Sequence, residues 1–184
     1  FYFGQDERVR GEDAVKKAVE NATDWLLAKG YTNVLVEIDN ESNVGKYDHA
    51  ILKPARVHEL IDLVKKRSEG KVRSPAGRLL VSTSMGGGAI PPENLVAAAD
   101  FLLIHGNGVS NPDRIRKMVE TCRAIKTYRG QPILFNEDDH FGFDMVVCWC
   151  LNLVADLDFQ PVVLEETAET KVVKDGNGAT FRRH

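Results

Sequence analysis

The sequence predicts an α/β fold in which parallel strands alternate with helices along the chain. Short apolar runs recur, and the longer segments between them carry apolar residues at helical spacing. No Pro- or Ser-rich linker interrupts this alternation, which indicates one sheet with right-handed crossovers. The chain has 184 residues, which is enough for one substantial hydrophobic core.

The expected elements follow from apolar spacing and from capping residues. Gly30 and Gly130 are typical helix stops, and Asn111-Pro112 is a typical helix start. The expected helices cover residues 11–29, 54–67, 91–99, 112–129 and 145–157. The expected strands cover residues 1–3, 34–36, 78–83, 101–104, 132–135 and 159–164.

The ends of the expected strands favour a barrel over an open doubly wound sheet. The glycine-rich stretch 84–90 follows the third strand and contains no phosphate-binding motif, so we interpret it as a flexible βα loop. A complete (β/α)8 barrel takes about 250 residues. The sequence therefore predicts a partial TIM barrel, approximately strands 3 to 8, that lacks the first βα units. Each of the first five expected strands ends at a polar residue, as at a barrel mouth: Gln5, Glu41, Thr83, His105 and Glu137.

Composition narrows the classes of partner. Net charge is −3 and the basic residues are scattered, which argues against nucleic acid or an anionic membrane as the main partner. No apolar run reaches the length of a membrane span, and nothing in the sequence calls for a cofactor or a metal. We expect a catalytic domain over residues 1–164 and a polar, disordered tail over residues 165–184.

Two Asn-Glu pairs lie at matching strand ends, Asn40-Glu41 and Asn136-Glu137. Two further strands are expected between them, and strands so separated lie across a barrel mouth, where their end residues converge. Paired carboxyl groups are the machinery of glycoside hydrolysis: about 5 to 5.5 Å between them gives retention, and about 6.5 to 9.5 Å gives inversion. The pattern therefore predicts a carbohydrate substrate and two catalytic acids, Glu41 and Glu137.

On these residues the chain resembles the C-terminal part of a clan of (β/α)8 glycoside hydrolases that includes the family 5 cellulases and mannanases. In that clan the acid/base glutamate ends strand 4 directly after an asparagine, and the nucleophile glutamate ends strand 7. The resemblance implies a retaining glycosidase acting on a β-linked oligo- or polysaccharide. It implies Glu41 as acid/base, Glu137 as nucleophile, and Asn40 as a donor to the sugar 2-hydroxyl.

Other residues are expected to contact the substrate. His105 ends the strand that matches strand 6, and Asn107 stands where the family often has a tyrosine. The chain also departs from the clan at its end, because its late tryptophan, Trp149, lies in an apolar stretch typical of a core helix. The loop beside Glu137 either binds sugar hydroxyls or is a solvated acidic loop. The remaining substrate-binding residues predicted are Asn136, Asp139, His140 and Tyr47.

Two alternatives stay open on the sequence. The first is an inactive barrel fragment or a non-catalytic carbohydrate-binding module, since missing strands would leave open sheet edges. The second is a metal-dependent barrel hydrolase that uses His105, Asp139 and His140 together with Glu137.

Overall fold

The computed structural model describes residues 6–31, 33–44, 47–109 and 111–137, with three later strands. Its helices are α1 (Glu12–Ala28), α2 (His58–Ser68), α3 (Glu93–Ala98), α4 (Pro112–Arg123) and the short 3-10 helices Asp6–Arg8 and Ala50–Leu52. Its strands are β1 (Leu35–Glu37), β2 (Leu80–Ser82), β3 (Leu102–His105), β4 (Ile133–Glu137), β5 (Leu164–Thr167), β6 (Thr170–Lys174) and β7 (Thr180–Arg182).

The first four strands are parallel and follow one another in chain order. β1 pairs with β2, and β3 pairs with β4, both in parallel register. A parallel bridge between Ser84 and Leu103 joins the end of β2 to β3. Helices alternate with these strands as the sequence predicts, whereas the described strands do not close into a barrel. The partial barrel therefore stays a prediction.

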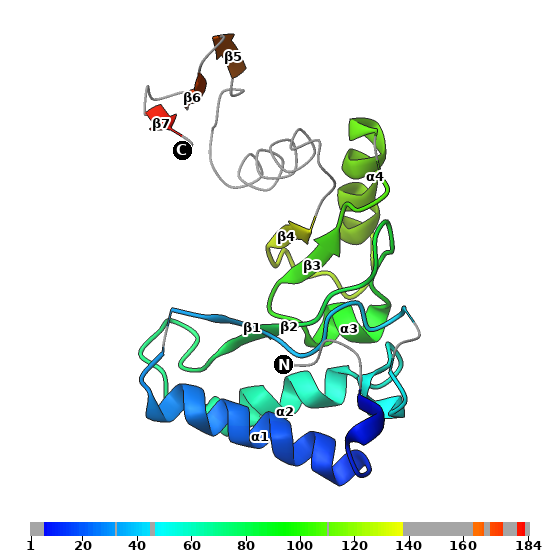
Figure 1. Ribbon diagram of the computed structural model, residues 1–184, viewed down its shortest axis with the longest axis vertical. Coiled ribbons are helices and arrows are strands. Elements are labelled where there is room, and N and C mark those ends of the chain that lie inside the picture. Colours follow the sequence, from blue (N-terminus) through cyan, green and yellow to red (C-terminus); the bar gives the residue numbers. More distant parts are fainter. Residues whose placement is uncertain are drawn as a thin grey trace.

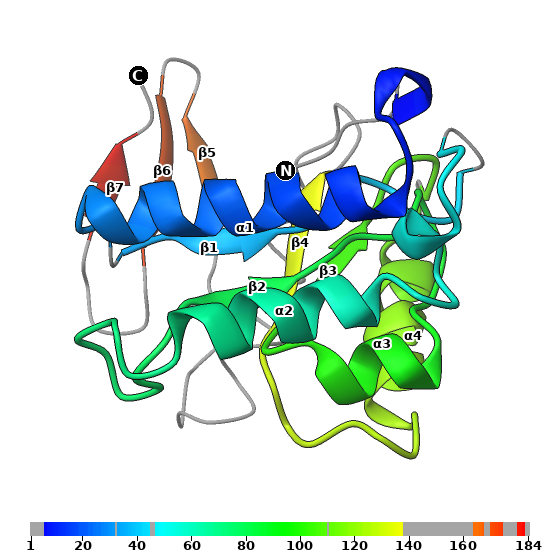
Figure 2. The same cartoon turned by 90° about the horizontal axis from the view of Figure 1, so that it is seen from below.

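One face of the β1–β2 pair packs on two helices. α1 and α2 lie side by side along this face (Figures 1 and 2). Val36 and Val81 belong to one buried apolar cluster with residues of both helices. Because side chains alternate along a strand, Leu35 and Leu80 point to the other face, where they are opposite one another and exposed. The buried helix residues of this cluster include Val15, Val19, Leu60, Ile61 and Val64.

The start of α4 and the end of α1 agree with the capping residues in the sequence, whereas α4 ends at Arg123, before the expected stop at Gly130. The Asn111 side chain accepts a hydrogen bond from the Asp113 backbone N–H at 2.8 Å, with Pro112 at the first helical position of α4. α1 begins within a residue of its expected start and ends just before Gly30. α2 begins at His58, four residues after Pro54.

The end of the chain contains regular structure inside the segment expected to be a disordered tail. β5 pairs with β6 and β6 with β7, both antiparallel. The β-branched pair Val172-Val173 favours such strands. The domain boundary at residue 164 stays a prediction. The strand expected at 1–3 and the helix expected at 145–157, which includes Trp149, lie outside the described residues.

Among the described helices, none combines the length and the apolar character needed to cross a membrane.

Candidate functional site

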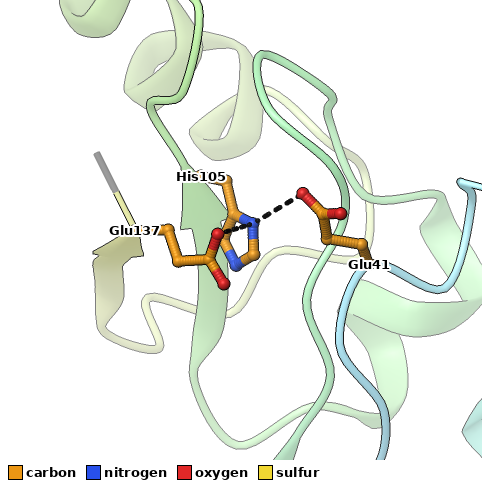
Figure 3. Close-up of side chains that lie close together, drawn as sticks. All are labelled: Glu41, His105 and Glu137. Atoms are coloured by element: carbon orange, nitrogen blue, oxygen red, sulfur yellow. Dashed lines mark hydrogen bonds and ion pairs between the residues drawn. The ribbon is translucent and has the colours of Figure 1, made fainter. Parts of the chain in front are cut away.

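The ends of β1, β3 and β4 bring three predicted residues together. Glu41 follows β1, His105 is the last residue of β3, and Glu137 is the last residue of β4. Figure 3 shows the imidazole of His105 between the two carboxylates. The two glutamates predicted to be catalytic thus lie in one place, although they are far apart in sequence.

The distances within this group are short. Nδ1 of His105 lies 3.2 Å from Oε1 of Glu41 and 3.4 Å from Oε2 of Glu137. One carboxylate oxygen of Glu41 and one of Glu137 lie within 4.8 Å of each other. That limit, which refers to one oxygen of each group, is compatible with the roughly 5 to 5.5 Å between the carboxyl groups of retaining glycosidases.

Burial differs sharply between the imidazole and the carboxylates. The His105 side chain is 0% exposed, whereas those of Glu41 and Glu137 are 18% and 35% exposed. The imidazole ring therefore lies at the buried end of the site, and both carboxylates are partly exposed to solvent. A substrate arriving from solvent would meet the two carboxylates first.

The backbone of Glu41 adopts a strained conformation. Its φ is 54°, and it is the one non-glycine residue with positive φ in the described part of the chain. Such a conformation costs on the order of 1–3 kcal/mol and is concentrated at functional sites. Ser84 holds it in place: its hydroxyl accepts from the Glu41 N–H at 2.9 Å, and its carbonyl accepts from the Ser42 N–H at 3.1 Å.

A buried acid lies two residues before Glu41. Asp39 is fully buried, and the Thr83 hydroxyl hydrogen-bonds its carboxyl group and lies 2.7 Å from its backbone oxygen. Burial, together with the nearby negative charge of Glu37, outweighs the opposing hydrogen bond from Thr83 and raises the pKa of Asp39 to about 7. Asp39 is therefore substantially protonated at neutral pH, beneath the site.

Asn107 contacts the second glutamate. Its side-chain Nδ2 donates to Oε2 of Glu137 at 3.1 Å. The glycine-rich loop makes this position possible, because a Cβ on Gly87 would lie 2.3 Å from the backbone oxygen of Asn107. Gly88 also donates its N–H to the His105 carbonyl at 2.9 Å. The loop thus packs against the residues of the site, a role that the sequence interpretation of a flexible connecting loop did not include.

Tyr47, predicted to bind the substrate, instead has a structural role. Its side chain is 3% exposed, and its hydroxyl donates to the backbone oxygen of Asn40 at 2.6 Å. It therefore holds the segment that carries Glu41 and presents no ring surface to a sugar. Asn40 is half-buried beside Glu41, and Asn136 is exposed beside Glu137. The predicted residues Asp139 and His140 lie outside the described residues.

Asp6 anchors the loop after Tyr47, and nothing in the sequence pointed to it. Its carboxylate accepts the backbone N–H groups of Asp48 and His49, both at 2.9 Å, and lies 2.5 Å from Nδ1 of His49. Burial raises the pKa of Asp6, but the hydrogen bonds from His49 and Asp48 outweigh it and hold the pKa below its ordinary value. Asp6 thereby fixes the loop beside Asn40.

The same three side chains could also hold a metal ion. Tetrahedral Zn²⁺ with bonds of about 2.0–2.1 Å places neighbouring nitrogen and oxygen ligands about 3.3 Å apart. The two distances from His105 Nδ1, 3.2 and 3.4 Å, match that spacing. The two carboxylate oxygens would have to move closer to each other to complete such a site.

Comparison of the chain with protein families, with curated proteins and with solved structures finds no match. The resemblance to the glycosidase clan therefore stays a prediction, and the function has to be argued from the geometry of Glu41, His105 and Glu137.

Proposed function

We propose that the protein is a retaining glycoside hydrolase that acts on a β-linked oligo- or polysaccharide. The observation that carries the proposal is the pair of partly exposed carboxylates of Glu41 and Glu137, within 4.8 Å of each other across a buried histidine. Carboxylates this close together favour direct attack by a carboxylate over attack by a water molecule.

In the first step a Glu137 oxygen attacks the anomeric carbon, and an ester bond forms between them. The bond from that carbon to the leaving oxygen breaks, and the leaving oxygen takes the proton of Glu41. In the second step Glu41, now a carboxylate, takes a proton from water as the water oxygen attacks the anomeric carbon. The ester bond breaks, Glu137 leaves as a carboxylate, and the sugar keeps its original configuration.

The side chains around the pair suit these roles. Asn107 donates to Glu137 and so orients the carboxylate that attacks. Glu41 is the more enclosed of the two acids, with 18% of its side chain exposed against 35% for Glu137. We therefore assign Glu41 as acid/base and Glu137 as nucleophile, with Asn40 beside the sugar 2-hydroxyl as the resemblance implies.

Hydrolysis of a panel of aryl β-glycosides and β-linked oligosaccharides tests the proposal. Glu41→Gln and Glu137→Gln keep the size of each side chain and remove its acid–base or nucleophilic chemistry. Each is expected to lower the rate at least about 100-fold on a substrate that needs acid assistance. Glu120→Gln, an exposed change on α4, is the matched control and is expected to be fully active. Full activity of Glu137→Gln would contradict the proposal.

Azide distinguishes the two roles. In Glu137→Ala, azide can attack in place of the missing carboxylate, and the product is expected to be the α-glycosyl azide. In Glu41→Ala, azide can replace water in the second step, and the product is expected to be the β-glycosyl azide. The opposite pairing of products would reverse the assignment of Glu41 and Glu137.

A metal-dependent hydrolase is the second candidate, favoured by the 3.2 and 3.4 Å distances from His105 Nδ1. In this case Glu41, His105 and Glu137 would be the ligands. Metal analysis of the active protein and assays after treatment with a chelator separate the candidates. Activity that falls on chelation and returns with added Zn²⁺ would favour the metal-dependent enzyme. Saccharide binding without any hydrolysis would favour the carbohydrate-binding module.

A further inference from the structure

The buried imidazole of His105 has one hydrogen-bonding atom directed at the site. Nδ1 lies almost equally far from both glutamates, 3.2 Å from Glu41 and 3.4 Å from Glu137, and Figure 3 shows it between the two. Nε2, the other ring nitrogen, is buried and has no hydrogen-bond partner in the part of the chain that the structure describes. The ring therefore acts on the site through Nδ1 alone.

This arrangement fixes the position of the imidazole proton. A proton on Nε2 would leave a buried donor without a partner and would turn the Nδ1 lone pair toward a carboxylate. A proton on Nδ1 gives the ring a donor that faces two oxygen acceptors. The geometry therefore favours a proton on Nδ1 of His105.

The proposed reaction moves one negative charge from one side of this donor to the other. Before the first step Glu137 is ionised and Glu41 is protonated. After that step Glu137 is a neutral ester and Glu41 is ionised. The second step reverses the transfer. The pair thus holds one negative charge throughout, and the charge alternates between the two acceptors of His105.

We propose that His105 is a shared positioning residue whose single Nδ1–H serves each glutamate in turn, following the charge between them. The inference rests on the proposed glycosidase function. Hydrogen bonds to a charged acceptor are stronger than those to a neutral one, so the N–H is drawn to whichever carboxylate is ionised. In each transition state the negative charge is divided between Glu41 and Glu137, and the N–H that lies between them faces both carboxylates at once.

The backbone around His105 holds the ring in this shared position. The pairing of β3 with β4 shifts register between Ile104 and His105, so His105 is opposite Glu137. The Gly106 N–H donates to the Glu137 carbonyl at 2.8 Å, and the Gly88 N–H donates to the His105 carbonyl at 2.9 Å. Because the side chain is fully buried, the ring is confined between the two acids and only its partner changes.

Asn107 provides a contrast. Its amide donates to Glu137 and to no other residue of the trio. It therefore stabilises the Glu137 carboxylate, which is consumed in the first step and released in the second. Removing this donor should slow the second step, whereas removing the His105 donor should slow both.

The kinetic test uses two near-isosteric variants of His105, compared with the wild-type protein after its glycosidase activity has been established. His105→Asn keeps an N–H donor near the Nδ1 position, and His105→Leu removes it. A 2,4-dinitrophenyl glycoside reports the second step through kcat, and a substrate with a poor leaving group reports the first step through kcat/KM. We expect His105→Leu to lower both by about 10- to 100-fold and His105→Asn to recover part of each loss. Asn107→Leu is expected to lower kcat on the dinitrophenyl substrate and to change kcat/KM less.

A loss confined to one of the two steps in His105→Leu would overturn the shared role. So would a His105→Asn variant no faster than His105→Leu in either step. An inactive wild-type protein would instead contradict the proposed function, so the two failures are distinguishable.

A spectroscopic test needs no active variant and no change at His105. In the 15N NMR spectrum of the histidine rings, we expect His105 to be protonated at Nδ1 and unprotonated at Nε2. Its Nδ1 resonance should shift in Glu41→Gln and also in Glu137→Gln, because the donor faces both acids. A ring protonated at Nε2 alone, or a resonance that responds to only one of the two substitutions, would overturn the proposal.

Discussion

Asn107 donates its side-chain amide to Oε2 of Glu137 across 3.1 Å, from the loop after β3 to the end of β4. This hydrogen bond holds the Glu137 carboxylate in place. The carboxylate is the reactant of the first proposed step and the leaving group of the second, so the same contact affects the two steps differently.

Asn107→Leu is therefore expected to act mainly on the step in which Glu137 leaves. A hydrogen bond to a charged group contributes about 1.5–3 kcal/mol, so kcat on an activated aryl glycoside should fall about 10-fold or more while kcat/KM changes less. Steady-state kinetics on 2,4-dinitrophenyl glycosides measure both quantities. A larger fall in kcat/KM than in kcat would show that Asn107 has another role.

The positive φ of Glu41 gives a prediction for stability. A side chain in the left-handed region costs about 1–2 kcal/mol, and glycine avoids this cost. Glu41→Gly should therefore unfold with a free energy about 1 kcal/mol higher than that of Glu41→Ala, although both lack the catalytic carboxyl. Chemical denaturation of the two variants measures this difference. Equal stability, or a more stable alanine variant, would show that the backbone of Glu41 is not strained.

The contact between Gly87 and Asn107 predicts a steric effect. A methyl group at Gly87 would overlap the Asn107 carbonyl, so Gly87→Ala should lower the free energy of unfolding by about 1–3 kcal/mol and also lower activity. Gly77→Ala is the control, because Gly77 has a φ of +67° but open space around its Cβ position. It should cost about 1 kcal/mol through the backbone alone and leave activity unchanged. A fully active Gly87→Ala protein would contradict the packing of this loop on the site.

The raised pKa of Asp39, about 7, makes stability depend on pH. In the unfolded chain this carboxyl ionises near pH 3.9, so between those values the folded state binds more protons than the unfolded state. Its contribution to stability is complete below about pH 4 and is lost as pH rises through 7. Asp39→Asn mimics the protonated acid, so its stability relative to wild type should increase between pH 5 and pH 8. The exposed Asp62→Asn is the control and should show no such trend. Parallel stability curves for Asp39→Asn and wild type would contradict the assignment.

Local signals in the sequence were sufficient to predict several features of the structure. Asn111-Pro112 marks the start of α4 because a cap depends on neighbouring residues only. The meeting of Glu41 and Glu137 was also predictable, because the carboxyl ends of parallel strands share one edge of a sheet. His105 was predictable as a strand-end residue, but its place between the two acids depends on the register shift in β3–β4 pairing, which no local pattern encodes.

Polar contacts between residues far apart in the chain could not be predicted from the sequence. Ser84 and Thr83 hold the segment around Glu41 from more than 40 residues away, and a hydroxyl at a strand end has many possible partners. Asp6 is an acid in a polar stretch, and only the fold brings it to His49. Acids recur at every second position in Glu37, Asp39 and Glu41, a visible signal that carboxyl groups gather at the end of β1, and this pattern could have identified Asp39.

The most direct test of the central claim is covalent trapping of the nucleophile. The protein is incubated with an activated 2-deoxy-2-fluoro β-glycoside of the sugar that it hydrolyses, then digested and analysed by mass spectrometry. The fluorine slows the second step more than the first, so the glycosyl ester should accumulate. We predict one adduct, on the carboxyl group of Glu137, and a hydrolysis product of retained configuration. Hydrolysis with inversion, or an adduct on a residue other than Glu137, would contradict the account.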